Sequence, residues 1–211
     1  MNRSMMNDAL RLELKARLSA HRFSHTLGVE KEMRALASIY LPDRVEEAAS
    51  AGLLHDITKE FTREEHLSYA RKNGICIEAD EQENAALLHS RTGAYYAKEH
   101  YPLLITDDIF SAILKHTTAD ADMSVMDILL YLADFMEEGR GYESCQRLRS
   151  FFYTKLSERK LAPELLLFDT LIFALDLSLA VLERERCKIS DRSRRAREWA
   201  DAQREEYTGK K

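Results

Sequence analysis

The sequence predicts an all-α fold, and three observations lead to that prediction. Its 211 residues contain only 3 prolines and 7 glycines, so few residues interrupt regular structure. Apolar residues recur at spacings of three and four along most of the chain, which is the period of an amphipathic helix. No alternation of apolar and polar residues competes convincingly with that period, so we expect a bundle of helices without a sheet.

The predicted helices follow from this period, taken in order along the chain. Each keeps its apolar residues on one face and ends where helix-stopping or polar residues appear. The predicted ranges are 8–19, 22–39, 43–55, 63–73, 86–99, 107–115, 125–136, 142–152, 163–186 and 192–205.

Capping signals support several of these boundaries. Thr62 with Glu65, and Ser124 with Asp127, each place a side-chain acceptor before the first turn and a carboxylate three positions later. Asp127 is therefore assigned to a helix cap. Gly74 is a natural stop for the helix that begins after Thr62.

The most apolar predicted helix begins at Pro163, a residue that the first turn of a helix tolerates. Asp169 and Asp176 interrupt its apolar stretch, which argues against a membrane span and for a helix packed across the bundle. Its larger side chains are expected in the core, among them Phe168, Phe173 and Leu175. The charge-rich segment after it is expected to form a solvated or frayed terminal helix.

The composition is that of one soluble intracellular domain spanning residues 1–211. Hydrophobic residues make up 45% and charged residues 32% of the chain, and the net charge of -5 gives no overall attraction to nucleic acid or to an anionic membrane. The three cysteines, Cys76, Cys145 and Cys187, form no C-x-x-C pair, which favours neither a zinc–thiolate cluster nor a disulfide framework. The N-terminus lacks an apolar signal core, so a reducing cytoplasm is expected.

A histidine–aspartate pair, His55 and Asp56, follows the apolar face of the predicted 43–55 helix. Burying an imidazole and a carboxylate in apolar surroundings costs roughly a few kcal/mol for each group unless something compensates it. A metal ion would compensate both.

Four further residues interrupt or follow apolar helical patterns in the same way. They are His25, His89, His116 and Asp134. Imidazole and carboxylate groups without a thiolate form a nitrogen and oxygen site suited to iron, manganese, cobalt, nickel or zinc. The wide gaps between these residues suit ligands that are gathered from different helices.

The order H…HD…H…H…D resembles the HD superfamily of metal-dependent phosphohydrolases, which are helical bundles. The segments HRFSHTLGV, AGLLHDITK, HSRTGA, HTTADADMS and DILLYLADFMEEGR resemble more closely the bacterial YqeK-type family of symmetrical bis(5'-nucleosyl)-tetraphosphatases. The resemblance runs from about residue 14 to 140, so we expect the HD core there and C-terminal helices at about 141–206 packed on it. It implies an enzyme that cleaves diadenosine tetraphosphate to two ADP.

The resemblance also implies roles for individual residues. His25, His55, Asp56 and Asp134 would hold the metal, with iron favoured, and the metal would activate a water molecule as the nucleophile. Lys59 and Arg140 match basic positions that contact phosphates in the resembled family. By position alone, Arg22, three residues before His25 on the same helix face, would add positive charge, and Thr117 would add a hydroxyl hydrogen bond beside His116. Asp56, His89 and His116 are candidate catalytic groups, and these three with Asp134 also belong to the implied nucleotide-binding set.

The role of His89 and His116 stays open. In di-metal HD proteins the equivalent pair holds a second ion that is bridged through the aspartate corresponding to Asp56. In the resembled family the pair would instead contact phosphate around a single metal. A ligand must be neutral, whereas a protonated imidazole donates to phosphate, so the sequence leaves the metal count at one or two.

Several functions remain as alternatives. They are an HD phosphohydrolase of another nucleotide, a non-catalytic nucleotide sensor and a di-iron oxygenase. A homodimer is expected by family analogy alone, and the sequence fixes neither the metal nor the physiological nucleotide.

Four residues depart from the family pattern. Ala119 and Asp120 stand where the family usually has glycine and arginine, Ile128 where it has lysine, and Glu138 where it has proline. An acidic residue in place of a basic one is expected to weaken phosphate attraction or to change the preferred nucleotide. Three other histidines, His21, His66 and His100, lie outside the ordered set and are expected to be exposed or locally hydrogen-bonded.

Overall fold

The computed structural model describes residues 2–209, and within that range it contains helices, turns and loops but no strand. The predicted all-α class is confirmed. In chain order the helices are α1 (Arg3–Arg17), α2 (Ala20–Tyr40), η1 (Pro42–Arg44), α3 (Val45–Leu54), α4 (Arg63–Lys72), α5 (Ala79–Glu83), η2 (Ala85–Leu87), α6 (Leu88–His100), α7 (Asp107–Lys115), α8 (Val125–Met136), α9 (Glu143–Glu158), α10 (Pro163–Arg184) and α11 (Asp191–Gly209).

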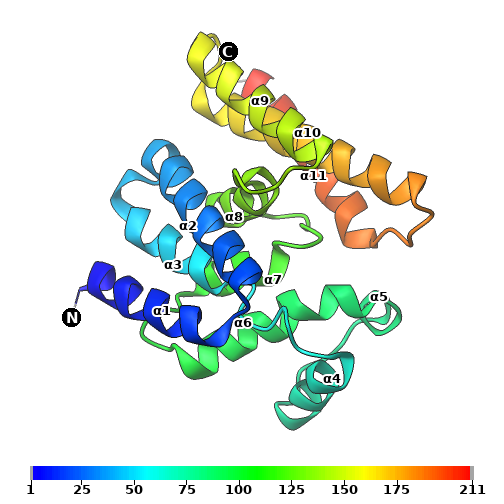
Figure 1. Ribbon diagram of the computed structural model, residues 1–211. Helices are drawn as coiled ribbons and strands as arrows, with labels where there is room; N and C mark the ends of the chain where they lie inside the picture. Colours follow the sequence, from blue (N-terminus) through cyan, green and yellow to red (C-terminus); the bar gives the residue numbers. More distant parts are fainter. Residues whose placement is uncertain (1, 210–211) are drawn as a thin grey trace.

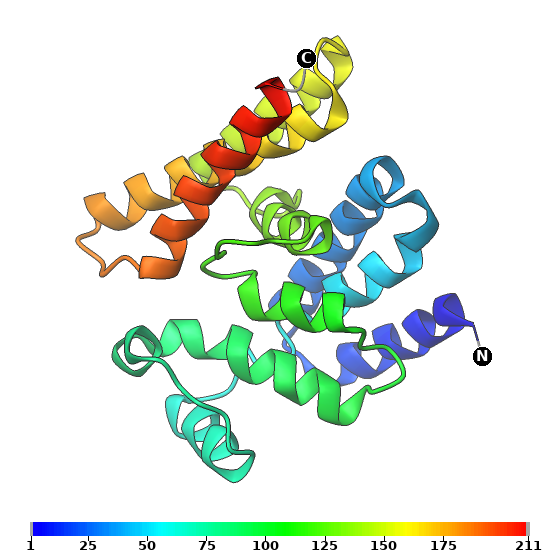
Figure 2. The ribbon, with the colours of Figure 1, turned by 180° about the vertical axis from the view of Figure 1, so that it is seen from behind.

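Helix α2 lies near the centre of the bundle, where it packs against α3 on one side and α8 on another. Helix α7 contacts α3, α6 and α8. Figure 1 shows α9, α10 and α11 side by side at one end of the molecule and α4 at the other, and Figure 2 shows the same separation from behind. The inward faces of α2 and α8 supply fully buried side chains such as Met33, Leu36 and Leu129. This central packing fixes the helices that carry the histidines and aspartates described below.

The capping signals act as predicted. Thr62 accepts a hydrogen bond from the Glu65 backbone, and Ser124 accepts one from the Asp127 backbone, with the reciprocal bonds also present. The cap assigned to Asp127 is thus confirmed. Gly74 follows the end of α4 with a φ of 63°, a left-handed conformation that favours glycine.

Three predicted boundaries were wrong by four residues or more, including the end of α11 at Gly209 rather than 205, and a short helix was missed. Helix α1 begins at Arg3 rather than residue 8, because the Asn2 side chain caps it by accepting from Met5 N. Helix α9 continues to Glu158, six residues beyond the predicted end at 152. Helix α5 has the sequence ADEQE, and five mostly polar residues carry no helical period for sequence analysis to detect.

The C-terminal helices are more firmly packed than the sequence suggests. By length and composition α10 would pass for a membrane span, alone among the helices of residues 2–209. Here it contacts α8, α9 and α11 and buries Phe168, Leu171 and Leu175, as expected for a core helix, whereas Phe173 is half-buried against the core. The expectation of a solvated or frayed helix is wrong for the first turns of α11, where Arg192 and Ala196 are buried.

Candidate metal centre

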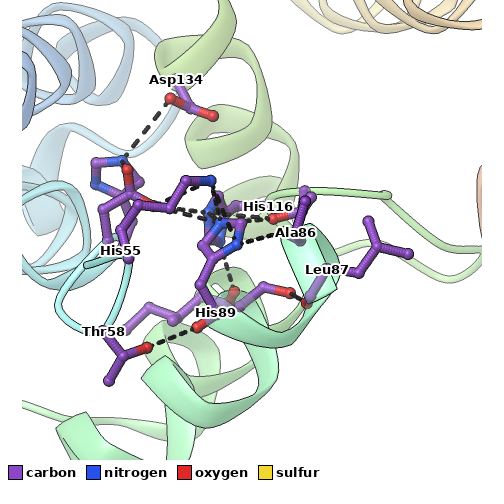
Figure 3. A network of polar contacts seen from close by, with 12 residues as sticks. His55, Thr58, Ala86, Leu87, His89, His116 and Asp134 are labelled. Carbon is purple, nitrogen blue, oxygen red and sulfur yellow. Dashed lines mark hydrogen bonds and ion pairs between the residues drawn. The ribbon is translucent and has the colours of Figure 1, made fainter. Parts of the chain in front are cut away.

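The histidines and aspartates that the sequence singled out converge in the middle of the bundle. They come from five places: His25 from α2, His55 and Asp56 from the end of α3, His89 from the start of α6, His116 from the end of α7, and Asp134 from α8. Figure 3 shows His55, His89, His116 and Asp134 directed toward one another. Sequence separations of more than a hundred residues are therefore bridged by the packing of α2, α3, α7 and α8.

The first half of the cluster joins α2, α3 and α8. The Nε2 atoms of His25 and His55 lie 3.3 Å apart, and His25 Nε2 lies 3.0 Å from Asp134 Oδ1. His55 Nε2 lies 3.4 Å from Asp56 Oδ2 and 3.8 Å from Asp134 Oδ1. His25, His55 and Asp134 have ligand atoms close enough together to share one metal ion.

The second half lies on the other side of the Asp56 carboxylate. The Nε2 atoms of His89 and His116 lie 3.1 Å apart. Asp56 Oδ1 lies 3.3 Å from His89 Nε2 and 3.6 Å from His116 Nε2, so the two oxygens of one carboxylate face different histidine pairs. His55, Asp56 and His116 form a second group with metal-binding spacing.

The outer ring nitrogens fix the tautomers of these histidines. Three rings place Nδ1 at 2.7 Å from a backbone carbonyl three residues earlier: His55 at Gly52, His89 at Ala86 and His116 at Ile113. A carbonyl only accepts, so each Nδ1 carries the proton and each Nε2 presents a lone pair to the centre. His25 Nδ1 faces the Glu137 carboxylate at 3.2 Å, which has the same effect.

The geometry of these histidines and aspartates is by itself suited to a divalent metal ion. Lone pairs on facing Nε2 atoms repel one another, and a buried carboxylate oxygen beside them adds negative charge. Asp56 Oδ1 is buried and has no hydrogen-bond partner among the described residues. Nitrogen and oxygen donors without thiolate match the ligand preferences of iron, manganese, cobalt, nickel and zinc.

The pKa values of His55, His89 and the two aspartates favour ligand-competent protonation states, whereas for His25 the contacts with Asp134 and Glu137 outweigh burial and raise the pKa. Burial lowers the pKa of His55 and, together with the charge of Lys59, holds the pKa of His89 well below its ordinary value. Burial alone would raise the pKa of Asp56 and Asp134. The histidines around Asp56, and Arg140 with His25 beside Asp134, outweigh burial and hold both carboxyl pKa values well below the ordinary range.

Cationic side chains surround the cluster at the positions that the sequence indicated. Arg22 Nη1 donates to Asp56 Oδ2, and Arg140 Nη2 donates to Asp134 Oδ1. Lys59 Nζ lies 3.0 Å from His89 Nε2, and burial lowers the lysine pKa. Thr117 Oγ1 lies 3.1 Å from His89 Nε2. All ten residues singled out for the site thus lie together, although the roles assigned to them stay predictions.

One residue at this site, Glu137, was not predicted from the sequence, and the expectation for His66, outside the site, was partly wrong. Glu137, which faces the outer nitrogen of His25, lies three residues after Asp134 on the same side of the chain, and that spacing was the available signal. His66 was expected to be exposed or locally bonded. It is 3% exposed, and its Nδ1 lies 2.7 Å from Thr92 Oγ1, on a different helix. His21 and His100 are exposed, as expected.

The structure shows the surroundings of each residue that departs from the family pattern. Ala119 has a φ of 56°, in the left-handed region where glycine is favoured. Asp120 pairs with Arg195 of α11, with Oδ1 3.0 Å from Nη2, so an arginine from the C-terminal helix neutralises the acidic residue. Ile128 is buried in the core, and Glu138 is exposed and pairs with Lys31.

This helical bundle, with four histidines and two aspartates gathered at its centre, has the fold and site of the histidine–aspartate class of proteins. A family model described as "HD domain" matches residues 22–138, and the chain belongs to the HD domain family, a family of hydrolases. Comparison with individual proteins narrows the relationship within that family.

The chain is 32% identical over 157 residues to "Bis(5'-nucleosyl)-tetraphosphatase, symmetrical" of Halalkalibacterium halodurans, covering 72% of this chain and 80% of the relative. It is 27% identical over 145 residues to the protein of the same name from Bacillus subtilis, covering 69% of this chain and 76% of the relative. A crystal structure described as a predicted HD superfamily hydrolase involved in NAD metabolism, from Clostridium acetobutylicum, superposes with a TM-score of 0.80 at 26% identity, covering 92% and 96% of the two chains.

Proposed function

We propose that this protein is a metal-dependent hydrolase that cleaves diadenosine tetraphosphate symmetrically to two ADP. The observation that carries the proposal is the convergence of four imidazole Nε2 atoms on the Asp56 carboxylate. That geometry suits a phosphoanhydride hydrolase, and the names of the relatives point to the symmetrical tetraphosphate as substrate.

Four residues would hold the first metal: His25, His55, Asp56 and Asp134. We propose iron for this position, since the family resemblance favours it and the donor set accepts it. His89 and His116, with the second oxygen of Asp56, would either hold a second ion or contact phosphate. When bound, a divalent metal supplies an activated water and neutralises charge on the phosphate.

The cationic side chains around the cluster would bind and orient the polyphosphate. Arg22 and Arg140 now bond to Asp56 and Asp134, the carboxylates proposed as ligands. A metal that took over these oxygens would leave both guanidinium groups free to bind phosphate oxygens. Lys59 and Thr117 point at the His89 side of the cluster and would hold the phosphate group on that side.

A pocket of about 720 Å³ adjoins the centre and suits a nucleoside. It lies between the start of α9 and the last turns of α10, and Arg140 lines it. Phe135 and Tyr142 offer aromatic surface, and Leu177 and Val181 offer apolar surface, against which a base can pack. Since Arg140 borders both the pocket and Asp134, a nucleotide with its base in the pocket would have its phosphates at the cluster.

The cellular setting that we propose is the cytoplasm. The three cysteines are free, with Cys145 buried and the other two exposed, which suits a reducing compartment. The homodimer suggested by family analogy stays a prediction, and light scattering of the purified protein tests it.

The test is product analysis with a substrate panel. Protein loaded anaerobically with Fe²⁺ or Mn²⁺ is incubated with diadenosine tetraphosphate, other dinucleotides and mononucleotides, and the products are separated by anion exchange. Two ADP as the main product supports the proposal, and AMP with ATP contradicts it. His55→Ala should abolish turnover, whereas His100→Ala, at an exposed histidine outside the cluster, should not.

The same panel distinguishes the alternatives. A faster reaction with another nucleotide would identify a different HD phosphohydrolase. Tight nucleotide binding without turnover under both metals would identify a sensor, and oxygen-dependent substrate consumption would identify a di-iron oxygenase.

A further inference from the structure

His25 differs from the other three histidines of the cluster in what holds its outer nitrogen. The other three donate Nδ1–H to backbone carbonyls at 2.7 Å. His25 Nδ1 instead faces a side chain, the Glu137 carboxylate, with 3.2 Å between Nδ1 and Oε1. One ring of the centre therefore depends on a side chain for its orientation.

The position of His25 within its helix explains this difference. His55 and His116 cap the C-terminal ends of α3 and α7, and His89 is the second residue of α6, so carbonyls near these rings are accessible. His25 lies inside α2, where the preceding carbonyls already accept hydrogen bonds from the helix backbone. A partner from another helix is the remaining way to fix the ring.

Glu137 is firmly held in place to serve as that partner. It is 3% exposed and caps the C-terminal end of α8, with its own N–H bonded to Ala133 O. Its second oxygen, Oε2, accepts from Gly139 N at 2.6 Å. Arg149 of α9 donates to the carbonyls of Met136 and Glu137, which fixes the backbone from which the carboxylate projects.

Two glycines provide the space for this carboxylate. A Cβ on Gly28, one helical turn after His25, would overlap Glu137 Oε2. A Cβ on Gly139 would lie 2.9 Å from the same oxygen. Because the obstructed atoms belong to the end of a side chain, alanine at Gly28 would push the carboxylate aside rather than unfold the backbone.

Both ring nitrogens of His25 therefore face carboxylates from one segment, residues 134–137. Asp134 Oδ1 lies 3.0 Å from His25 Nε2, and Glu137, three residues later, meets Nδ1. A carboxylate on the outer nitrogen of a metal-binding histidine fixes the tautomer and the ring orientation and makes the inner nitrogen a better donor.

We infer that Glu137 is a positioning residue for the metal centre, which acts through His25, and that Gly28 is required to seat it. This inference rests on the metal role proposed for His25. Glu137 itself lies behind the ring and need not touch the substrate.

Co²⁺ binding to the apoprotein provides the test, with affinity measured against a competing chelator and the visible absorption spectrum recorded in parallel. Wild type, Glu137→Ala, Glu137→Gln, Gly28→Ala and the Gly28→Ala/Glu137→Ala double variant are compared. Glu138→Ala is the matched control, because this neighbouring glutamate is exposed and pairs with Lys31 on the surface. Thermal unfolding of each apoprotein monitors folding.

Loss of the carboxylate should weaken Co²⁺ binding about 10–100-fold and alter the spectrum. Gly28→Ala should weaken binding similarly in the wild-type background and change nothing further when Glu137 is already alanine. Glu137→Gln, which keeps an acceptor for Nδ1–H, should recover part of the affinity. Glu138→Ala should bind within twofold of wild type.

Two results would overturn the inference: Co²⁺ affinity of Glu137→Ala within twofold of wild type, or a Gly28→Ala effect that persists undiminished in the double variant. If Glu137→Ala fails to fold, the Co²⁺ affinities of Gly28→Ala and Glu137→Gln decide the question. Wild-type affinity in both of these variants would refute the inference. Wild-type protein that binds no Co²⁺ would instead refute the metal proposal itself.

Discussion

Asp56 accepts a hydrogen bond from Arg22 Nη1 through Oδ2 at 2.5 Å, while its Oδ1 atom has no hydrogen-bond partner in residues 2–209. Oδ1 faces the Nε2 atoms of His89 and His116 instead. A single carboxylate thus borders an arginine on one side and two imidazole lone pairs on the other. Removing the carboxylate and removing the arginine should therefore have different consequences.

Asp56→Asn should abolish metal-dependent hydrolysis. The amide keeps the volume of the side chain but removes the negative charge shared by both histidine pairs, so metal affinity should fall strongly and turnover by about 10²–10³-fold or more. Metal analysis and initial rates measure both effects. Asp43→Asn, at an exposed aspartate, is the control, and full metal content in Asp56→Asn would contradict the assignment.

Arg22→Gln should impair substrate use without impairing metal binding. A lost charge-assisted contact to phosphate costs about 1.5–3 kcal/mol, equivalent to roughly 10–100-fold in kcat/KM. Metal affinity should stay the same or increase, because Arg22 no longer competes for Asp56 Oδ2. Isothermal titration with Mn²⁺ and steady-state kinetics separate the two quantities. A parallel loss of metal and activity would argue for a ligand-positioning role instead.

Arg195→Ala should raise KM for the nucleotide. Without this arginine, the charge of Asp120 is unpaired four residues after His116 and repels phosphate, with an expected effect of roughly two- to fivefold at low salt. Asp120→Asn should cancel the effect in the double variant. The contribution of this exposed pair to stability should stay below about 1 kcal/mol. An unchanged KM for Arg195→Ala at low ionic strength would show that the charge of Asp120 does not affect substrate binding.

His66 should make the apoprotein less stable in acid. Burial lowers its pKa from 6.5 to about 4 in the folded state, so above pH 6.5 both folded and unfolded states hold it neutral and its contribution is complete. Between pH 6.5 and 4 only the unfolded state gains the proton, and the free energy of unfolding falls by up to about 3 kcal/mol. Between pH 7.5 and 4.5, urea unfolding should show a smaller loss of unfolding free energy in His66→Gln than in wild type, because the other buried histidines still contribute. Equal losses in the two proteins would assign the pH dependence to other groups.

Two substitutions at left-handed positions should change stability in opposite directions. Gly74 has a φ of 63° with open space around it, so Gly74→Ala should destabilise the protein by about 1 kcal/mol through backbone strain alone. Arg159, exposed at the end of α9, has a φ of 52°, and Arg159→Gly should stabilise by about 0.5–1 kcal/mol. Denaturant unfolding measures both. The same sign for the two changes would contradict this interpretation.

The helices were predictable where local signals are strong. The capping boxes at Thr62 and Ser124 mark the starts of two helices from local sequence alone. The apolar period marks others, and α7 and α8 match their predicted ranges. Helix α5 was not predicted, because its five mostly polar residues carry no helical period, and some of its contacts come from distant parts of the chain. Buried Glu81 of this helix bonds to Arg192 of α11, and no local pattern records such a partner.

What the sequence determined by itself was the list of chemical groups and their order: four histidines and two aspartates, each placed by helical periodicity on an inward face. Only the tertiary structure decided how these groups meet. Packing of α2, α3, α6, α7 and α8 turned the two oxygens of Asp56 toward different histidine pairs and brought Glu137 behind His25. The physical reason is that a helix fixes the direction of a side chain relative to its own axis, whereas distances between helices depend on how the whole core packs.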